Sequence, residues 1–182
     1  ELIVVDDQSG DDTQQVVESY IGKTNNIRYF RNPVKGANNA RNLGIEKARG
    51  RYIAFLDDDD VSLPHRFESQ VSAMQRNASR FIVSWFEIRD RATGNLVKVD
   101  RTILRGSGAG FPSRWMIEKS LLEEVGGFNP EMIAMQEIEL SYRLAKLYTF
   151  HHHDDVVTTM FKTPGSTSSG EKGILGKIQL ME

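Results

Sequence analysis

Short apolar runs alternate with segments of helical spacing over the first 80 residues. The runs at 2–5 and 52–56 are continuously apolar, which is typical of strands buried on both faces of a parallel sheet. A third short strand is predicted at 27–30, and helices are predicted at 13–20, 38–48 and 62–76. This alternation indicates an α/β fold with a mostly parallel central sheet flanked by helices.

The pattern changes after residue 80. Apolar stretches at 81–88 and 96–104 flank Ala92-Thr93-Gly94-Asn95, which favours a hairpin. Further along, the sequence predicts a flexible glycine connection at 106–110, a helix at 137–147, and strands at 148–152 and 156–161. With no repeat or linker, we expect a single domain over 1–182, divided into 1–80, 81–161 and a mobile segment at 162–182.

Composition narrows the function classes. The 182 residues are 39% hydrophobic and 26% charged, as in ordinary soluble domains, and no apolar run has the length of a membrane span. The formal charge of -2 gives no basic excess for nucleic-acid binding. The absence of cysteine excludes disulfides and thiolate metal sites, and it fits a reducing cytoplasm.

Carboxylates follow two of the predicted strands, as Asp6-Asp7 after the first and as the run 57–60 after the third. If the strands are parallel, both clusters lie at the edge of the sheet where open α/β folds bind ligands. Such crowded carboxylates favour a divalent cation, Mg²⁺ or Mn²⁺. One cluster alone would be interpreted as a solvated loop. A calcium loop fits poorly, because Ser62 stands where glycine belongs.

A third acidic group opens the predicted helix near residue 137. Glu137 shares a face with Leu140 and Leu144, whereas Glu139 points elsewhere and can pair with Arg143 four residues on. The helix dipole favours an ionised carboxylate in the first turn. Glu137 therefore suits a general base, and an ordinary helix-terminal charge is the alternative.

Taken together, these segments resemble the family 2 glycosyltransferases of GT-A fold. The matching segments, in the family's order over residues 1 to about 147, are LIVVDDQSGDDT, GANNARNLGIEKARGRYIAFLDDDD with SLPHRFESQ, VGGFNPE and QEIELSYRLA, and TPGSTSS is similar to the family's closing loop. The resemblance implies a GT-A-like sandwich with a nucleotide-sugar-binding half at 1–80 and an acceptor and catalytic half at 81–161. It also implies an opening strand of the V-I-I-P-x-Y-N type, which this sequence does not contain.

The resemblance implies a role for each residue of the donor site. Asp7 would contact the nucleotide base, and Arg41 would support the donor site, with a purely structural role as the alternative. Asp57 and Asp59 match the D-x-D metal motif, with Asp59 as the more direct ligand of Mn²⁺ or Mg²⁺. Asp58 would lie near the ribose or diphosphate.

The implied chemistry is transfer of a sugar with inversion. Glu137 matches the catalytic base, although the family more often has aspartate after glutamate where this chain reads Gln136-Glu137. The donor would be a nucleotide diphosphate sugar, UDP being the common carrier. The acceptor would be a hydroxyl of a glycan or lipid-linked sugar in bacterial surface polysaccharide or lipopolysaccharide synthesis. We expect a cytoplasmic protein that can lie at the inner face of the membrane, and the oligomeric state stays open.

Three alternatives remain at this point. A receiver-type signalling domain would use LIVVDD as its first strand and Asp57 as phosphoacceptor, but its lysine-proline element would come far too late, at Lys162-Thr163-Pro164. A nucleotidyltransferase could use similar carboxylates on a similar sheet. A module that binds a sugar nucleotide without catalysis would differ from an enzyme only in an assay.

Overall fold

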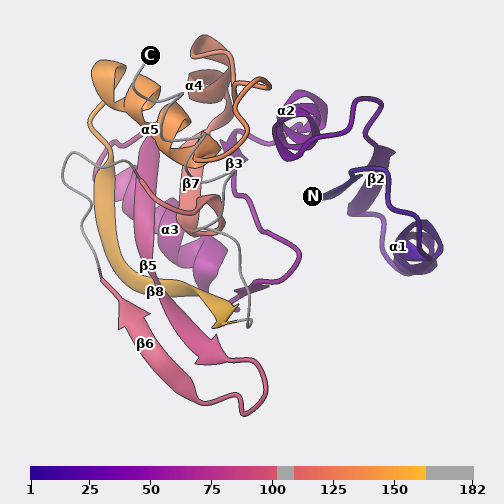
Figure 1. Ribbon diagram of the computed structural model, residues 1–182. Coiled ribbons are helices and arrows are strands. Elements are labelled where there is room, and N and C mark those ends of the chain that lie inside the picture. The colour runs from indigo at the N-terminus through magenta and orange to yellow at the C-terminus, as the bar shows by residue number, and fades with distance from the viewer. Residues whose placement is uncertain (102–108, 163–182) are drawn as a thin grey trace.

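The protein is described by a computed structural model, which defines residues 1–101 and 109–162 (Figure 1). The predicted glycine connection at 106–110 lies mostly outside these residues, as does the predicted mobile segment from residue 163 onward.

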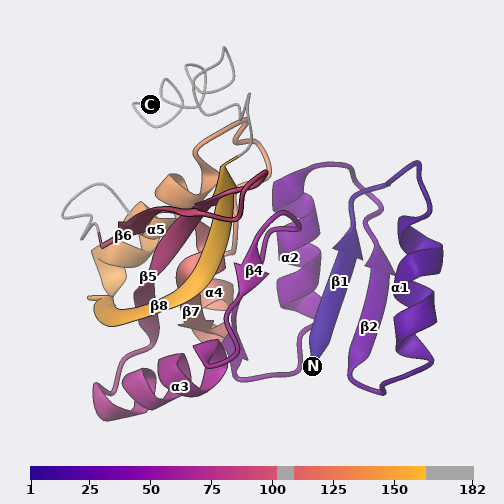
Figure 2. The same ribbon diagram turned by 90° about the horizontal axis from the view of Figure 1, so that it is seen from below.

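The first unit of the fold is a two-stranded parallel sheet. Strands β1 (Leu2–Asp6) and β2 (Ile27–Arg31) pair from Leu2 opposite Ile27 to Asp6 opposite Arg31. The helix between them, α1 (Thr13–Ile21), makes the crossover that a parallel pair requires. Helix α2 (Ala37–Lys47) follows β2 and packs on β1. Figure 2 shows α2 between this small sheet and the rest of the molecule.

The second unit is a curved six-stranded sheet in the order β3-β7-β5-β8-β4, with β6 also paired to β5. Its strands are β3 (Tyr52–Ile53), β4 (Val61–Ser62), β5 (Phe81–Asp90), β6 (Leu96–Asp100), β7 (Trp115–Glu118) and β8 (His151–Lys162). The central strand β5 pairs along one edge with β7 near its start and with β6 near its end, and along the other edge with β8.

The α/β fold is confirmed, but the sheet is mixed rather than mostly parallel. Within the larger sheet only β5 and β8 run parallel, and the other four pairings are antiparallel. The two continuous apolar runs are also less buried than expected, because Leu2 and Leu56 are exposed and the other residues of both runs are half-buried. An apolar run does not determine the direction of the neighbouring strands. The predicted strands at 148–152 and 156–161 form the single strand β8, because register shifts opposite β5 accommodate the polar residues between them.

The expectation of one shared sheet edge for the two acidic clusters is wrong in the described residues. Strand β1 pairs with β2, and the apolar run at 52–56 pairs only over Tyr52–Ile53, with β7. The two clusters therefore end strands of separate sheets, and another element has to bring them together.

Helices cover both faces of the larger sheet. On one face lie α4 (Lys119–Glu124) and α5 (Gln136–Leu147), and on the other lies α3 (Arg66–Arg76). The larger core cluster contains Phe81, Val83, Trp115, Ile117, Leu121, Leu122, Phe128, Leu140 and Leu144, together with Ile45 of α2 and Ala109. Ile82 and Met116, at the alternate strand positions, pack with Ala73 and Met74 of α3.

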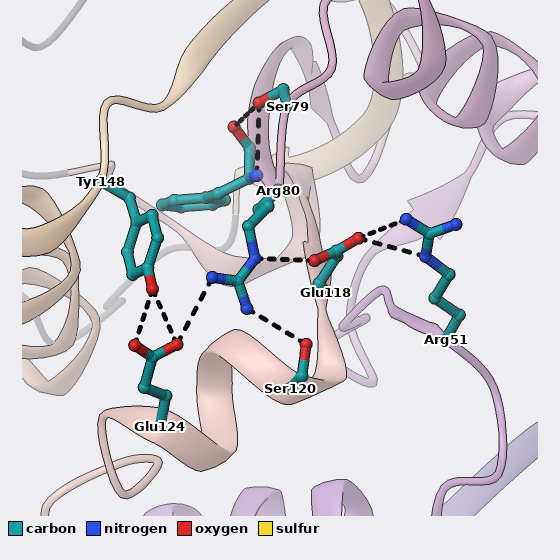
Figure 3. Close-up of polar contacts among 8 residues, drawn as sticks. Arg51, Ser79, Arg80, Glu118, Ser120, Glu124 and Tyr148 are labelled. Carbon is teal, nitrogen blue, oxygen red and sulfur yellow. Dashed lines mark hydrogen bonds and ion pairs between the residues drawn. The ribbon is translucent and has the colours of Figure 1, made fainter.

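A charged network fixes the end of the larger sheet at which β7 finishes (Figure 3). The largely buried carboxylate of Glu118 accepts hydrogen bonds from Arg51 Nη2 at 2.7 Å and from Arg80 Nε at 2.7 Å. Arg80 continues to Glu124, whose carboxylate also accepts a hydrogen bond from Tyr148 Oη. Burial alone would raise the pKa of Glu118, but the bonds from Arg51 and Arg80 outweigh it and lower that pKa.

Glu118→Gln is expected to lower the free energy of unfolding at pH 7 by about 1.5–3 kcal/mol, because hydrogen bonds to a charged group are lost. Since the folded-state pKa of Glu118 is lowered, its contribution is complete above the unfolded value of about 4.3 and is lost as pH falls through the folded value. Urea unfolding from pH 7 to pH 3 should therefore show the wild-type and variant curves converging in acid.

The matched control is Glu124→Gln in the same network, where the side chain is 48% exposed. Its loss should stay below about 1 kcal/mol, as for surface ion pairs. Equal losses for the two variants would contradict the assigned role of Glu118.

Candidate functional site

The acidic run 57–60 forms a tight turn. The backbone N–H of Asp60 donates to the carbonyl of Asp57 at 3.1 Å, which places Asp58 and Asp59 at the two corners. Asp58 and Asp59 are exposed, Asp57 is half-buried and Asp60 is buried. The turn therefore presents two carboxylates outward and draws one inward.

Buried polar residues bind the backbone of this turn and of the segment that leads into it. Ser113 Oγ accepts a hydrogen bond from the N–H of Asp57 at 3.0 Å, and Thr158 Oγ1 donates to the carbonyl of Ser113 at 2.7 Å. Arg66 is fully buried and donates to the carbonyls of Phe55 and Trp115. The backbone of the turn is thus tied to β8 through Ser113, and Arg66 ties the segment that leads into the turn to β7.

Asp60 is the buried member of the acidic run, and the sequence alone indicates no role for it. Its pKa is raised to about 6, chiefly by burial and also by the neighbouring Asp57 and Asp59, with Ser113 and Arg66 opposing the shift. Its Oδ2 is buried without a hydrogen-bond partner among the described residues. The sequence shows four equivalent aspartates, and only the fold distinguishes the inward-facing one.

Helix α2 connects the acidic turn to the segment that precedes α5. Arg41 Nη2 forms an ion pair with Asp57 Oδ1 at 3.0 Å. The same guanidinium lies over the ring of Phe128, 5.4 Å from its centroid, and Phe128 meets Phe55 edge to face. One side chain thereby touches both the acidic turn and the VGGFNPE segment, two parts of the chain about seventy residues apart.

Two asparagines on α2 bind the backbone of the same segment. Asn42 donates to the carbonyl of Phe128 and accepts from its N–H, each at 2.8 Å. One turn earlier, Asn38 donates to the carbonyls of Asn129 and Met132 at 2.7 and 3.3 Å. These bonds satisfy backbone groups that a non-repetitive segment would otherwise leave unpaired. The polar face of α2 therefore determines the path of the chain toward α5.

Arg143 holds the other side of this segment. Its guanidinium donates to the carbonyls of Val125 and Gly127 at 2.5 and 2.6 Å. It also forms the ion pair with Glu139 predicted from their four-residue spacing, with Nε 2.5 Å from Oε1. Held by α2 on one side and α5 on the other, the segment has little freedom to shift.

Asp7 contacts the N-terminus of α2. Its Oδ1 accepts hydrogen bonds from Asn32 Nδ2 at 2.7 Å and from the N–H of Gly36 at 2.8 Å, and Oδ2 lies 3.0 Å from the same N–H. Gly36 is the N-cap, with a φ of +140° that a side chain would disfavour. A carboxylate has about four acceptor sites, so Asp7 retains capacity for a further donor.

The neighbouring Asp6 is occupied within the fold. Hydrogen bonds from Ser9 and Tyr29, with a further contribution from Arg31, lower the pKa of Asp6 to about 2. The buried carboxylate lies 2.7 Å from the N–H of Ser9 and 2.6 Å from Tyr29 Oη. The charge of Asp6 is thus compensated within the fold without a cation, and so is that of Asp57, which pairs with Arg41.

Glu137 lies in the first turn of α5 and is half-buried. Leu140 and Leu144, on the same helical face, are fully buried. The carboxylate of Glu137 has no hydrogen-bond or ion-pair partner within 1–101 and 109–162. It stays a predicted base on the basis of its position and its uncommitted oxygens.

The structure also places Arg91, which the sequence did not indicate, at the acidic turn. Arg91 lies at the tip of the β5–β6 hairpin and donates from Nη2 to the backbone carbonyl of Asp59 at 3.1 Å. No spacing in the sequence relates residue 91 to residue 59, because the contact depends on the long-range pairing of β5 with β8 and of β8 with β4, the strand that follows the acidic turn.

The oxygen ligands of the turn fit a divalent cation that arrives with its substrate. No three His, Cys, Asp or Glu side chains of the described ranges converge closely enough to hold a metal ion. Mg²⁺ sites in nucleotide enzymes need only one or two carboxylates, since substrate phosphates and water complete the shell. Asp59, exposed at the corner of the turn, and Asp57 beside it are the residues that would hold such a cation.

Residues 1–135 match the profile of glycosyl transferase family 2, and the chain belongs to that family. An uncharacterized glycosyltransferase of Rickettsia felis is 43% identical over 96% of this chain and 31% of its own length. The Escherichia coli β-1,3-glucosyltransferase WfgD, whose name specifies UDP-Glc and α-D-GlcNAc-diphosphoundecaprenol, is 39% identical over 48% of this chain and 34% of its own length. The chain thus spans about a third of the length of these curated relatives.

The fold has a close counterpart among solved structures. Staphylococcus aureus TarS in complex with UDP-GlcNAc matches with a TM-score of 0.74 at 19% identity, over 93% of this chain and 52% of that chain. This likeness confirms the predicted GT-A-like fold. Because the chain belongs to glycosyl transferase family 2, the receiver and nucleotidyltransferase alternatives are excluded.

Gly127→Ala is expected to destabilise the protein more than Gly126→Ala. Both glycines have positive φ, +69° and +80°, which costs about 1–2 kcal/mol for alanine. A Cβ on Gly127 would also lie 2.5 Å from Asn42 Oδ1 and displace the amide that binds Phe128, whereas a Cβ on Gly126 meets nothing within 4 Å. The extra loss should be about 1–3 kcal/mol by urea unfolding. Equal losses would mean that the Asn42 contact contributes nothing.

Proposed function

We propose that this chain forms part of an inverting glycosyltransferase that moves a sugar from a UDP-sugar to a hydroxyl of a lipid-linked glycan. The observation that supports this proposal most is the set of contacts made by α2. Its N-cap Gly36 binds Asp7, Arg41 pairs with Asp57, and Asn42 binds the segment before Glu137. Family 2 membership supports the reaction class.

The donor would bind along α2. Asp7 would accept a hydrogen bond from the base, and Asp58 would lie near the ribose or diphosphate. A divalent cation, Mn²⁺ or Mg²⁺, held by Asp59 with Asp57, would supply charge stabilisation for the departing diphosphate. Arg41 would keep Asp57 in place, since its guanidinium already pairs with that carboxylate.

The acceptor would be activated by Glu137. A carboxylate without a partner among the described residues can accept the proton of an acceptor hydroxyl as that oxygen attacks the anomeric carbon from the face opposite the leaving group. The bond to the diphosphate oxygen breaks as the new glycosidic bond forms, which inverts the anomeric centre. The hydrogen bonds between Asn42 and the backbone of Phe128 would fix the path of the segment that leads to Glu137.

A lipid-linked acceptor is supported by the names of two relatives. WfgD is named for a diphosphoundecaprenol acceptor, and a Campylobacter jejuni β-1,3-glucosyltransferase, 44% identical over 35% of this chain, is named for GalNAc(5)-diNAcBac-PP-undecaprenol. No helix in the described part of the chain has the length and apolar character needed to cross a bilayer. From the lipid-linked substrates named for these two relatives, we propose a cytoplasmic protein acting at the inner face of the membrane, in surface polysaccharide synthesis.

Glu137→Gln should lower kcat for sugar transfer by about 10²–10⁴, because the amide cannot accept the proton. Transfer from UDP-sugars to a diphosphoundecaprenol-linked sugar with Mn²⁺ measures turnover, and calorimetry measures UDP binding, which should be unchanged.

The matched control is Glu139→Gln, two residues away, which weakens the ion pair with Arg143 and should lower stability while leaving kcat within a few-fold of wild type. Unchanged turnover in Glu137→Gln would remove Glu137 from the reaction. Absence of any transfer by the wild-type protein, with all common UDP-sugars, would count against the proposed function itself.

A further inference from the structure

Three arginines approach the acidic turn from different elements, and Arg91 differs from the other two. Arg41 is paired with the carboxylate of Asp57, and Arg66 is buried, with its donors on carbonyls and Gln70. Arg91 is exposed, and its one hydrogen bond to a described residue goes to a neutral acceptor, the carbonyl of Asp59.

The guanidinium of Arg91 is held in place without being neutralised. It lies 5.0 Å from the centroid of the Phe161 ring, near the end of β8. The hydrogen bond to Asp59 and this ring contact are its interactions with the described residues, and no carboxylate of those residues lies within 4 Å of it. A guanidinium has five N–H donors, so one bond leaves four for a ligand.

We infer that Arg91 binds the diphosphate of the nucleotide at the acidic turn. This inference rests on the proposed function, in which Asp59 holds a cation that shares its ligands with that diphosphate. Arg91 binds the backbone carbonyl of Asp59, the residue that would hold the cation. The positive charge of the Arg91 guanidinium therefore lies where the phosphate oxygens would approach. An oriented guanidinium donates two parallel hydrogen bonds to a phosphate and costs little rearrangement on binding.

The geometry favours arginine over lysine at this position. The planar guanidinium stacks on Phe161 and bonds the Asp59 carbonyl at the same time, whereas an ammonium group acts as a point charge on a flexible stem. Arg91 thus also links the hairpin to the acidic turn.

The test is calorimetric titration of UDP and UMP, each with saturating Mn²⁺, into wild type, Arg91→Ala and Arg91→Lys. Loss of a charge-assisted contact to the diphosphate should weaken UDP binding by about tenfold or more in Arg91→Ala. UMP binding should change much less, so the ratio of UDP to UMP affinity falls. Arg91→Lys should lie between the two.

Lys98→Ala on the same hairpin is the matched control, because Lys98 pairs with Asp100 and should leave the ratio unchanged. An unchanged ratio in Arg91→Ala would overturn the inference and leave the proposed function standing. No UDP binding by wild type would remove the proposed donor site, and the inference with it. A diphosphate could belong either to the nucleotide donor or to a lipid-linked acceptor, and a parallel titration with farnesyl diphosphate separates the two. If Arg91→Ala weakened binding of farnesyl diphosphate but not of UDP, the assignment to the nucleotide would be overturned.

Discussion

The arrangement of the site depends on the polar face of α2, where side chains bond to backbone that has no secondary structure of its own. Asn38 and Asn42 satisfy carbonyl and N–H groups between residues 128 and 132, and Arg41 pairs with Asp57. Losing one of these side-chain amides would destabilise the fold, because the backbone group left buried and unpaired has lost its hydration without compensation. The site is therefore fixed by hydrogen bonding as much as by apolar packing.

This constraint explains how two separate sheets can serve one site. The acidic turn belongs to the larger sheet and Asp7 to the smaller one, and no strand pairing joins β1 to β3 in the described residues. Helix α2 connects the two sheets, because its N-cap Gly36 donates a hydrogen bond to Asp7 and its Arg41 pairs with Asp57. The aromatic contacts of Phe128 with Arg41 and Phe55 add a packed connection between the acidic turn and the segment leading to α5.

The parts of this arrangement that are local in sequence could be predicted, and the parts that depend on long-range pairing could not. Hydrophobic periodicity predicted α1, α2, α3 and α5, and the four-residue spacing of Glu139 and Arg143 predicted their ion pair. Both kinds of prediction depend on neighbours three and four residues apart. Strand direction, the separation of β1 from β3 and the inward rotation of Asp60 depend on pairing across the chain. The contact of Arg91 with Asp59 had no sequence signal at all. Asp57 and Arg41 were predicted as site residues, but their pairing with each other was not.

We expect the surface held together by α2 to receive a nucleotide diphosphate and a cation opposite Glu137. A crystal structure with UDP and Mn²⁺, with anomalous diffraction recorded at the manganese edge, tests this expectation most directly. The expected result is a manganese peak coordinated by Asp59, Asp57 and the diphosphate, with Asp57 still paired to Arg41 and the Glu137 carboxylate facing the vacant sugar position. Manganese bound away from the acidic turn, or Glu137 directed away from the diphosphate, would contradict it.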